Sequence, residues 1–98
     1  EEEEVVELWK VEQIPSVKTK VNPPYPEIAR KAGIEDKVFV MVLVDKEGNV
    51  EQIGEIRGAE VFHEVVREAV PKWKFNPALQ NDKPIKVWVS LPITFTLK

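Results

Sequence analysis

The sequence predicts an α+β fold, in which one main helix packs across a small antiparallel sheet of three strands. A short helix precedes the sheet, and an N-terminal strand can extend it. Three patterns indicate this fold. Apolar residues occupy every second position from Ile85 to Leu97, as in a half-buried strand. A β-branched apolar run fills 37–44, and an apolar stripe of helical spacing runs from Val61 to Val70.

Length and composition suit one soluble domain. We expect the 98 residues to form a domain over 15–98, preceded by an acidic linker end and an arm at 1–14. The four carboxylates of Glu1–Glu4 exceed the net charge of −3, so the rest of the chain is nearly neutral and has no electrostatic basis for binding nucleic acid. The chain has no cysteine, which excludes disulfides and thiolate metal sites.

The amino-terminal part is expected to be extended. Residues 5–14 mix apolar and charged positions without a clear period, which is compatible with a short strand or with an arm held down by Trp9. The prolines between Pro15 and Pro26 disfavour helix and sheet alike and favour an extended path over the surface.

A short helix should follow this segment. It should begin at Pro26, whose missing N–H costs nothing in a first turn, and end at Gly33, which accepts the left-handed cap. Ile28, Ala29 and Ala32 would share one of its faces.

The next residues predict a hairpin. The near-continuous apolar run 37–44 is typical of a central strand covered on both faces. Residues 45–49 make the turn, with Gly48 in the left-handed conformation, and 50–57 form the return strand. A β-bulge at Gly54 would reconcile its irregular apolar spacing.

The main helix should begin at Glu60 and end at about Val70, because Pro71 cannot continue it. Trp73 then plugs the bottom of the core, and residues 76–84 form a turn-rich connection to the last strand.

The last strand is expected to lie at an edge of the sheet. Pro92 lies within it, and proline has no N–H for a ladder, so one side of the strand should be unpaired there. Such an edge accepts another extended chain. Trp88 falls on its polar face, where the indole would either cover the arm bearing Trp9 or contact a partner.

The sequence shows none of the residue patterns that catalysis usually requires. His63 is the only histidine, so neither a Ser/His/Asp arrangement nor a multi-histidine metal site can form with a second imidazole. Ser16 and Ser90 lack the context of a nucleophile, and the glycines are too dispersed to cradle a phosphate. We therefore expect a protein that is not an enzyme and needs no cofactor or metal.

The order and spacing of several short motifs resemble the carboxy-terminal domain of TonB-type energy transducers. The resemblance runs from about Val21 to Leu97. Asp36 and Asp82 depart from it, since members usually carry glycine at these turns. The motifs, in chain order, are Tyr25-Pro26-Glu27-Ile28-Ala29-Arg30, Gly33-Ile34-Glu35, Lys37-Val38, Asp45-x-x-Gly48-x-Val50, Lys72-Trp73-Lys74-Phe75-x-Pro77-Ala78, Asn81-x-Lys83-Pro84 and Leu91-Pro92-Ile93-x-Phe95.

The resemblance implies a periplasmic module, tethered to the inner membrane by an amino-terminal helix and a proline-rich spacer upstream of this chain. It implies that ExbB and ExbD couple the proton gradient to the transducer. The domain would then grip the TonB box, a short segment of outer-membrane transporters for iron chelates, vitamin B12 or other scarce solutes, as a strand added beside its last strand.

The expected partner-binding residues come from the alternating strand and, by matching position in the family, from the proline-rich segment. Alternatives remain open: the same edge could pair two copies of this chain in a structural homodimer, or the domain could belong to a different membrane protein. The expected contacts are Asn22, Pro23, Pro24, Tyr25, Pro26, Lys86, Val87, Trp88, Val89, Ser90 and Leu91.

Overall fold

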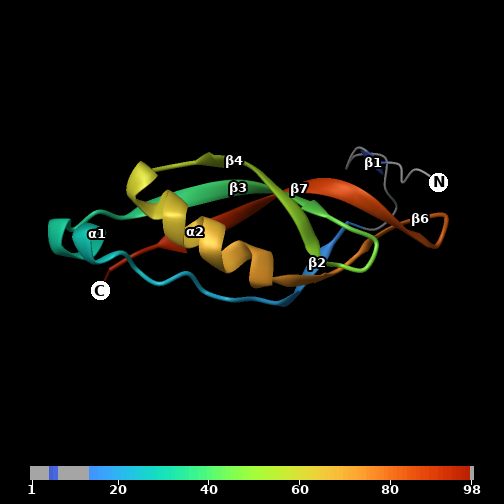
Figure 1. The fold of residues 1–98 in the computed structure, drawn as a ribbon, viewed down its shortest axis with the longest axis horizontal. Helices are drawn as coiled ribbons and strands as arrows, with labels where there is room; N and C mark the ends of the chain where they lie inside the picture. Colours follow the sequence, from blue (N-terminus) through green and yellow to red (C-terminus); the bar gives the residue numbers. More distant parts are fainter. Residues whose placement is uncertain (1–4, 7–13, 98) are drawn as a thin grey trace.

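The computed structural model describes residues 5–6 and 14–97, which form an elongated body with its long strands along the longest axis (Figure 1). None of the helices in this part of the chain is long and apolar enough to cross a membrane. In chain order the elements are β1 (Val5–Val6), β2 (Ser16–Thr19), α1 (Glu27–Ala32), β3 (Asp36–Val44), β4 (Val50–Arg57), the 3₁₀ turn η2 (Glu60–Phe62), α2 (His63–Ala69), the 3₁₀ turn η3 (Val70–Lys72), β5 (Lys74–Asn76), β6 (Ala78–Gln80) and β7 (Lys83–Phe95).

The main sheet is built around β3, which lies between β7 and β4 and pairs antiparallel with both. The β3–β7 register runs from Val44 opposite Val87 to Asp36 opposite Phe95. β6 pairs with the first residues of β7, and β1 pairs parallel with β7 on the side away from β3. The α+β fold and its three long strands are therefore confirmed, as the centre of a larger sheet.

One face of this sheet packs against α2 and its flanking turns (Figure 1). The alternation that predicted the last strand is confirmed, because its inward residues from Val87 to Phe95 are at most 8% exposed. The predicted helical stripe is confirmed too, and Trp73 closes the core as expected, at 2% exposure. The fully buried side chains of largest volume are Phe62, Val38, Val40, Val42, Val44, Val66, Val70 and Val87.

One expectation about packed faces is wrong. β3 is not covered on both sides, because its outward side chain Phe39 is 42% exposed and only Leu43, at 5%, is buried on that face. On α1 only Ala29 is buried, whereas Ile28 is 70% exposed. Among the described residues, a single layer of helix covers one face of the sheet and no element covers the other, and the short α1 buries only one of its sides.

The β3–β4 hairpin has the predicted turn and bulge. Gly48 has φ 86°, and the register shifts by one residue between Ile53 and Ile56, where Gly54 lies. A Cβ at Gly54 would lie 3.0 Å from Cζ3 of Trp88. Because glycine has no side chain, the indole of Trp88 can extend from β7 across β3 as far as β4. Trp88 is thus half-buried against the outward face of its own sheet.

Two segments expected to be irregular form short strands. Ser16–Thr19 pairs antiparallel with β5 in a small second sheet, since these residues lie between the prolines and keep their N–H groups. Within 76–84, β6 turns back on β7 through Asn81 and Asp82, with φ 54° and 62°. Successive left-handed residues are the geometry of a two-residue hairpin, which suits Asn and Asp.

The amino-terminal arm is described only in part. Val5–Val6 forms β1, so an N-terminal strand does extend the sheet. The acidic block at 1–4 and Trp9 lie outside the described residues.

Candidate partner-binding edge

Among the described residues, the side of β7 that faces away from β3 is open from Trp88 to Phe95. β1 pairs on that side with Lys86 and Val87 only. From Trp88 to Phe95, β3 pairs on one side, and no strand within the described ranges 5–6 and 14–97 pairs on the other. The prediction of an unpaired side at Pro92 is therefore confirmed for the described chain.

The expected contact residues of β7 fall into different environments. β1 occupies the outer side of Lys86 and Val87, which removes these two from the open stretch. Val89 and Leu91 point into the core, so their side chains are buried and only their backbone can meet a partner. Ser90 is exposed, and Trp88 is half-buried against Gly54.

The proline-rich segment meets β7 near its far end, beyond the expected contact residues 86–91. It runs from β2 to α1 along the edge of the molecule (Figure 1). A hollow of about 190 Å³ separates it from the strand. Residues from both faces of β7 line the hollow, so it opens at the strand's edge. The lining residues are Lys20, Asn22, Pro23, Tyr25, Ile93, Thr94, Phe95 and Thr96.

An aromatic cluster holds this end of the site. The rings of Phe62 and Phe95 stack with centroids 4.1 Å apart and an interplanar angle of 15°. Tyr25 packs edge-on against both, with centroids at 5.6 Å and 5.7 Å. The edge-to-face arrangement is the favoured one for such rings, and it fixes the proline-rich segment on the core.

The phenol of Tyr25 also ties this segment to the loop after α1, because its hydroxyl donates a hydrogen bond to the carbonyl oxygen of Ile34. Partial burial, and then the negative charge of Glu35, raise the pKa of Tyr25 above its ordinary value. The neutral phenol is therefore the stable form in the site.

A second link fixes the start of the segment. The indole nitrogen of Trp73 donates a hydrogen bond of 2.7 Å to the carbonyl oxygen of Val21, and the Lys20 ammonium lies 5.7 Å from the centroid of the same ring system. Trp73 is thus both the expected core plug and the support of the site. Of the other expected contacts, Pro24 is exposed and Pro26 is half-buried at the start of α1.

The expected contact residues end at Leu91 and leave out Ile93 to Thr96, which line the hollow. The signal was present, since the alternation reaches Leu97 and Phe95 belongs to a recognised motif. The alternation does not give the position along β7 at which the proline-rich segment passes. That position depends on the packing of Tyr25 against Phe62.

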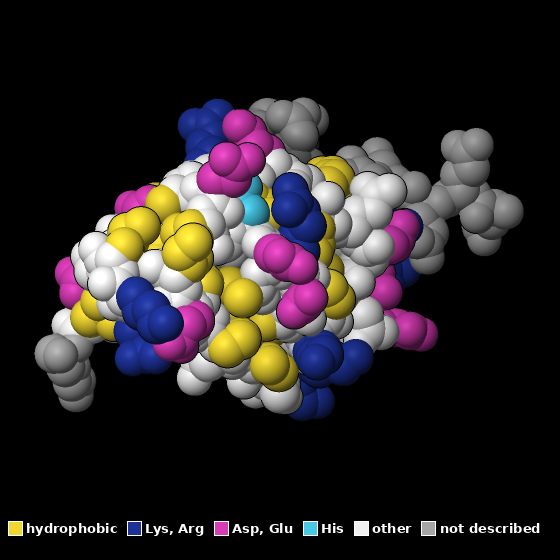
Figure 2. Space-filling model, turned by 60° about the vertical axis from the view of Figure 1, so that its left-hand side comes forward, with side chains coloured by type: hydrophobic (Ala, Val, Ile, Leu, Met, Phe, Trp, Pro, Cys, Tyr) yellow, Lys and Arg dark blue, Asp and Glu magenta, His cyan; other side chains and the backbone are white. Residues whose placement is uncertain are grey.

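His63 takes no part in this edge. It lies at the surface of α2 among charged side chains (Figure 2), and its Nε2 is 3.0 Å from the carbonyl oxygen of Gly58. His63 is therefore half-buried at the surface of the helix.

Comparison with known proteins identifies the family. The family model described as "Gram-negative bacterial TonB protein C-terminal" matches residues 21–97, which include the open edge and the proline-rich segment. The chain belongs to the TonB C-terminal domain family. The predicted resemblance is therefore confirmed.

Relatives within the family are similar over most of this chain. Protein TonB of Vibrio cholerae is 36% identical over 84 residues, which are 84% of this chain and 34% of the relative. Protein TonB of Xanthomonas campestris pv. campestris is 32% identical over 80 residues, or 79% of this chain and 36% of the relative. The chain thus spans about a third of the length of these relatives.

The TonB C-terminal fold is confirmed by a solved structure. The solution NMR structure of the Pseudomonas aeruginosa TonB CTD superposes with a TM-score of 0.64 at 26% sequence identity. The match covers 86% of this chain and 87% of that one, so nearly the whole described domain follows the family architecture.

Proposed function

We propose that this domain binds the TonB box of outer-membrane transporters by strand addition to β7 and transmits force to them in energy-dependent nutrient uptake. The observation that carries the proposal is the open edge from Trp88 to Phe95, which ends at the hollow beside Asn22 and Tyr25. An added strand would form backbone hydrogen bonds with the edge, and the hollow would receive one end of it.

The strength of such a contact fits a transducer. Five or six added residues make on the order of five backbone hydrogen bonds, each contributing ~1 kcal/mol net, so binding is moderate and tolerant of sequence. A pull along the strand loads these bonds together. The domain therefore transmits force while the contact remains reversible at rest.

The wider assignment follows the family. We place the binding domain at 15–98 in the periplasm and residues 1–14 in the arm that leads to it, with an inner-membrane anchor upstream. ExbB and ExbD would act through that upstream region, and the domain itself would be a binding module without catalytic function, cofactor or metal.

A titration of backbone amides tests the proposal. An unlabelled transporter peptide that contains the TonB box is added to the ¹⁵N-labelled protein while the amide signals of the protein are followed by NMR. We expect the largest shifts from Trp88 to Thr96 and at Asn22, because these groups line the open edge and its hollow. Shifts confined to α2 would contradict the proposal.

The control is the same peptide with alternate backbone nitrogens methylated. Its side chains are unchanged, but it cannot complete the ladder, so affinity should fall by at least about tenfold, the equivalent of one or two hydrogen bonds. Equal binding of both peptides would show that side chains, not strand pairing, hold the partner.

A further inference from the structure

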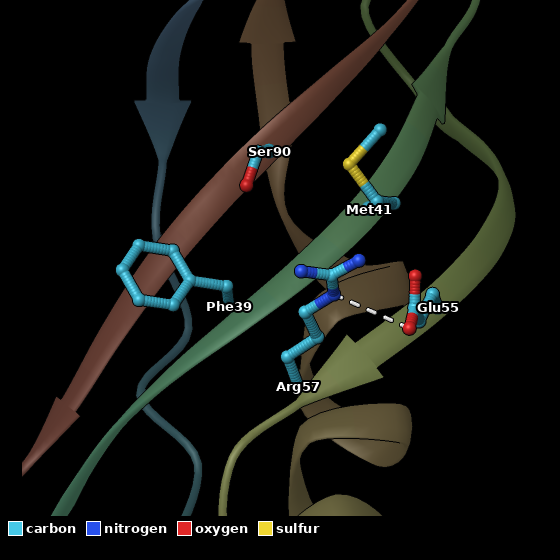
Figure 3. A pocket seen from close by; sticks show the side chains of 5 residues that line it. All are labelled: Phe39, Met41, Glu55, Arg57 and Ser90. Carbon is cyan, nitrogen blue, oxygen red and sulfur yellow. Dashed lines mark ion pairs between the residues drawn. The ribbon is translucent and has the colours of Figure 1, made fainter.

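The outward face of the sheet, opposite α2, carries a hollow of about 480 Å³. It spans three neighbouring strands, and its side chains all stand on the same side of the ribbon (Figure 3). Ser90 of β7 lies opposite Met41 of β3 in the register. The lining residues are Phe39, Met41, Glu55, Arg57 and Ser90.

The walls of this hollow are apolar and its far rim is charged. Phe39 is 42% exposed and Met41 is half-buried, so both offer apolar surface to a side chain that enters the hollow. On the β4 side, Nε of Arg57 is 3.2 Å from a carboxylate oxygen of Glu55, with both side chains largely exposed. The ammonium of Lys37 lies 5.9 Å from the centroid of the Phe39 ring.

The hollow is continuous with the open edge of β7. Ser90 belongs to both, and it is the smallest residue on the outward face of the strand, between Trp88 and Pro92. Only the short side chain of Ser90 would therefore lie between Met41 and a residue of an added strand opposite Ser90.

The molecule shows how far an aromatic side chain reaches over a strand. The indole of Trp88 starts on β7, crosses β3 and comes within 3.0 Å of a Cβ position at Gly54 on β4. An added strand would lie ~4.8 Å from β7. One strand, β7, would separate it from β3, just as β3 separates β7 from β4. A ring at the position opposite Ser90 thus reaches Phe39 and Met41.

We propose that this hollow is a specificity subsite, which receives an aromatic side chain of the strand that adds to β7, at the position opposite Ser90. The proposal rests on strand addition at β7. Phe39 and Met41 supply apolar and sulfur–aromatic contact, and the guanidinium of Arg57 lies at the rim where a ring can approach it. A small side chain at that position would leave these surfaces in water.

The test uses acetylated and amidated heptapeptides of alternating Thr and Val, in which one Phe or one Ala is moved through the sequence. We expect one position at which Phe binds about tenfold more tightly than Ala, the gain from covering roughly half of a ring. Met41 is the only methionine, so its ¹³C-methyl signal reports on the hollow alone. That signal should shift, with contacts to the peptide ring, only for the preferred peptide.

A matched pair of variants distinguishes binding in the hollow from nonspecific binding to exposed apolar side chains. Phe39→Ser removes one wall and should reduce the preference for Phe to about threefold or less. Ile28→Ser removes an exposed apolar side chain of α1, 70% exposed, and should leave the preference unchanged. Equal losses in both variants would overturn the subsite.

The remaining outcomes are also decisive. If no peptide shifts the amides of β7, strand addition itself fails. If peptides shift those amides but Phe and Ala bind equally at every position, strand addition stands and the subsite is overturned. If the Met41 methyl shifts with protein concentration alone, a second copy covers the face and the subsite is also overturned.

Discussion

Single residues connect parts of this domain that are distant in the chain. Tyr25 packs on Phe62 and Phe95 and donates to the carbonyl of Ile34, so one side chain joins the proline-rich segment, α2's leading turn and the end of β7.

The titration of Tyr25 tests this arrangement directly, because it is the only tyrosine. Its pKa is raised in the folded protein, so the stability it contributes is complete below the unfolded value of about 10 and is lost as pH rises through the folded pKa. Absorbance titration of the tyrosinate should give a midpoint above that of the unfolded chain.

A matched variant identifies the cause. Glu35→Gln removes a negative charge near the phenol and should lower the midpoint, while burial keeps it above the ordinary value. A midpoint at or below that of the unfolded chain would contradict the packing described for Tyr25.

At the scale of elements, turns decide how closely neighbouring segments approach. Gly48 in the β3–β4 turn lies against β5, where the amide of Phe75 donates a 2.8 Å hydrogen bond to its carbonyl oxygen. Gly33 ends α1 in the same left-handed region, but in open space. The two glycines thus share a conformation and differ in their surroundings.

This difference predicts unequal costs for the same substitution. Gly33→Ala, at φ 69°, should lower the free energy of unfolding by about 1 kcal/mol, the cost of the left-handed backbone. Gly48→Ala should cost roughly 3 kcal/mol or more, because its Cβ would lie 1.9 Å from the carbonyl oxygen of Phe75. Urea unfolding measures both, and equal costs would refute the close approach.

At the scale of the whole molecule, one sheet offers two surfaces without a covering element in the described chain: the edge of β7 and the outward face at Phe39. The two surfaces meet at Ser90 of β7. A partner strand could therefore pair with the backbone of β7 and be selected by a side chain on the outward face. Because the chain beyond Glu1–Glu4 is nearly neutral, we expect contacts rather than long-range charge to govern association.

The open edge should not pair two copies of this chain. A β7–β7 ladder would place Pro92, which cannot donate a hydrogen bond, in both strands, and proline is a common protection of natural edges. Sedimentation from low-micromolar to submillimolar protein should give the mass of one chain, 11.3 kDa. A dimer at low concentration would instead favour the homodimer alternative.

Local patterns were sufficient for most of the architecture. The alternation after Ile85 predicted β7, the spacing from Val61 to Val70 predicted the main helix, and Gly48 and Gly54 predicted a turn and a bulge. These features depend on neighbouring residues along the chain, because the periods of strand and helix and the freedom of glycine are properties of the local backbone. The order of short motifs also determined the family.

Only the tertiary structure decided how the site is assembled. It brought the proline-rich segment to Ile93–Thr96, placed β1 beside Lys86 and Val87, and left Phe39 exposed on the outward face. A period tells which face a residue occupies, but not which distant segment covers it. That choice follows from long-range packing, such as Tyr25 on Phe95, which no local window of sequence contains.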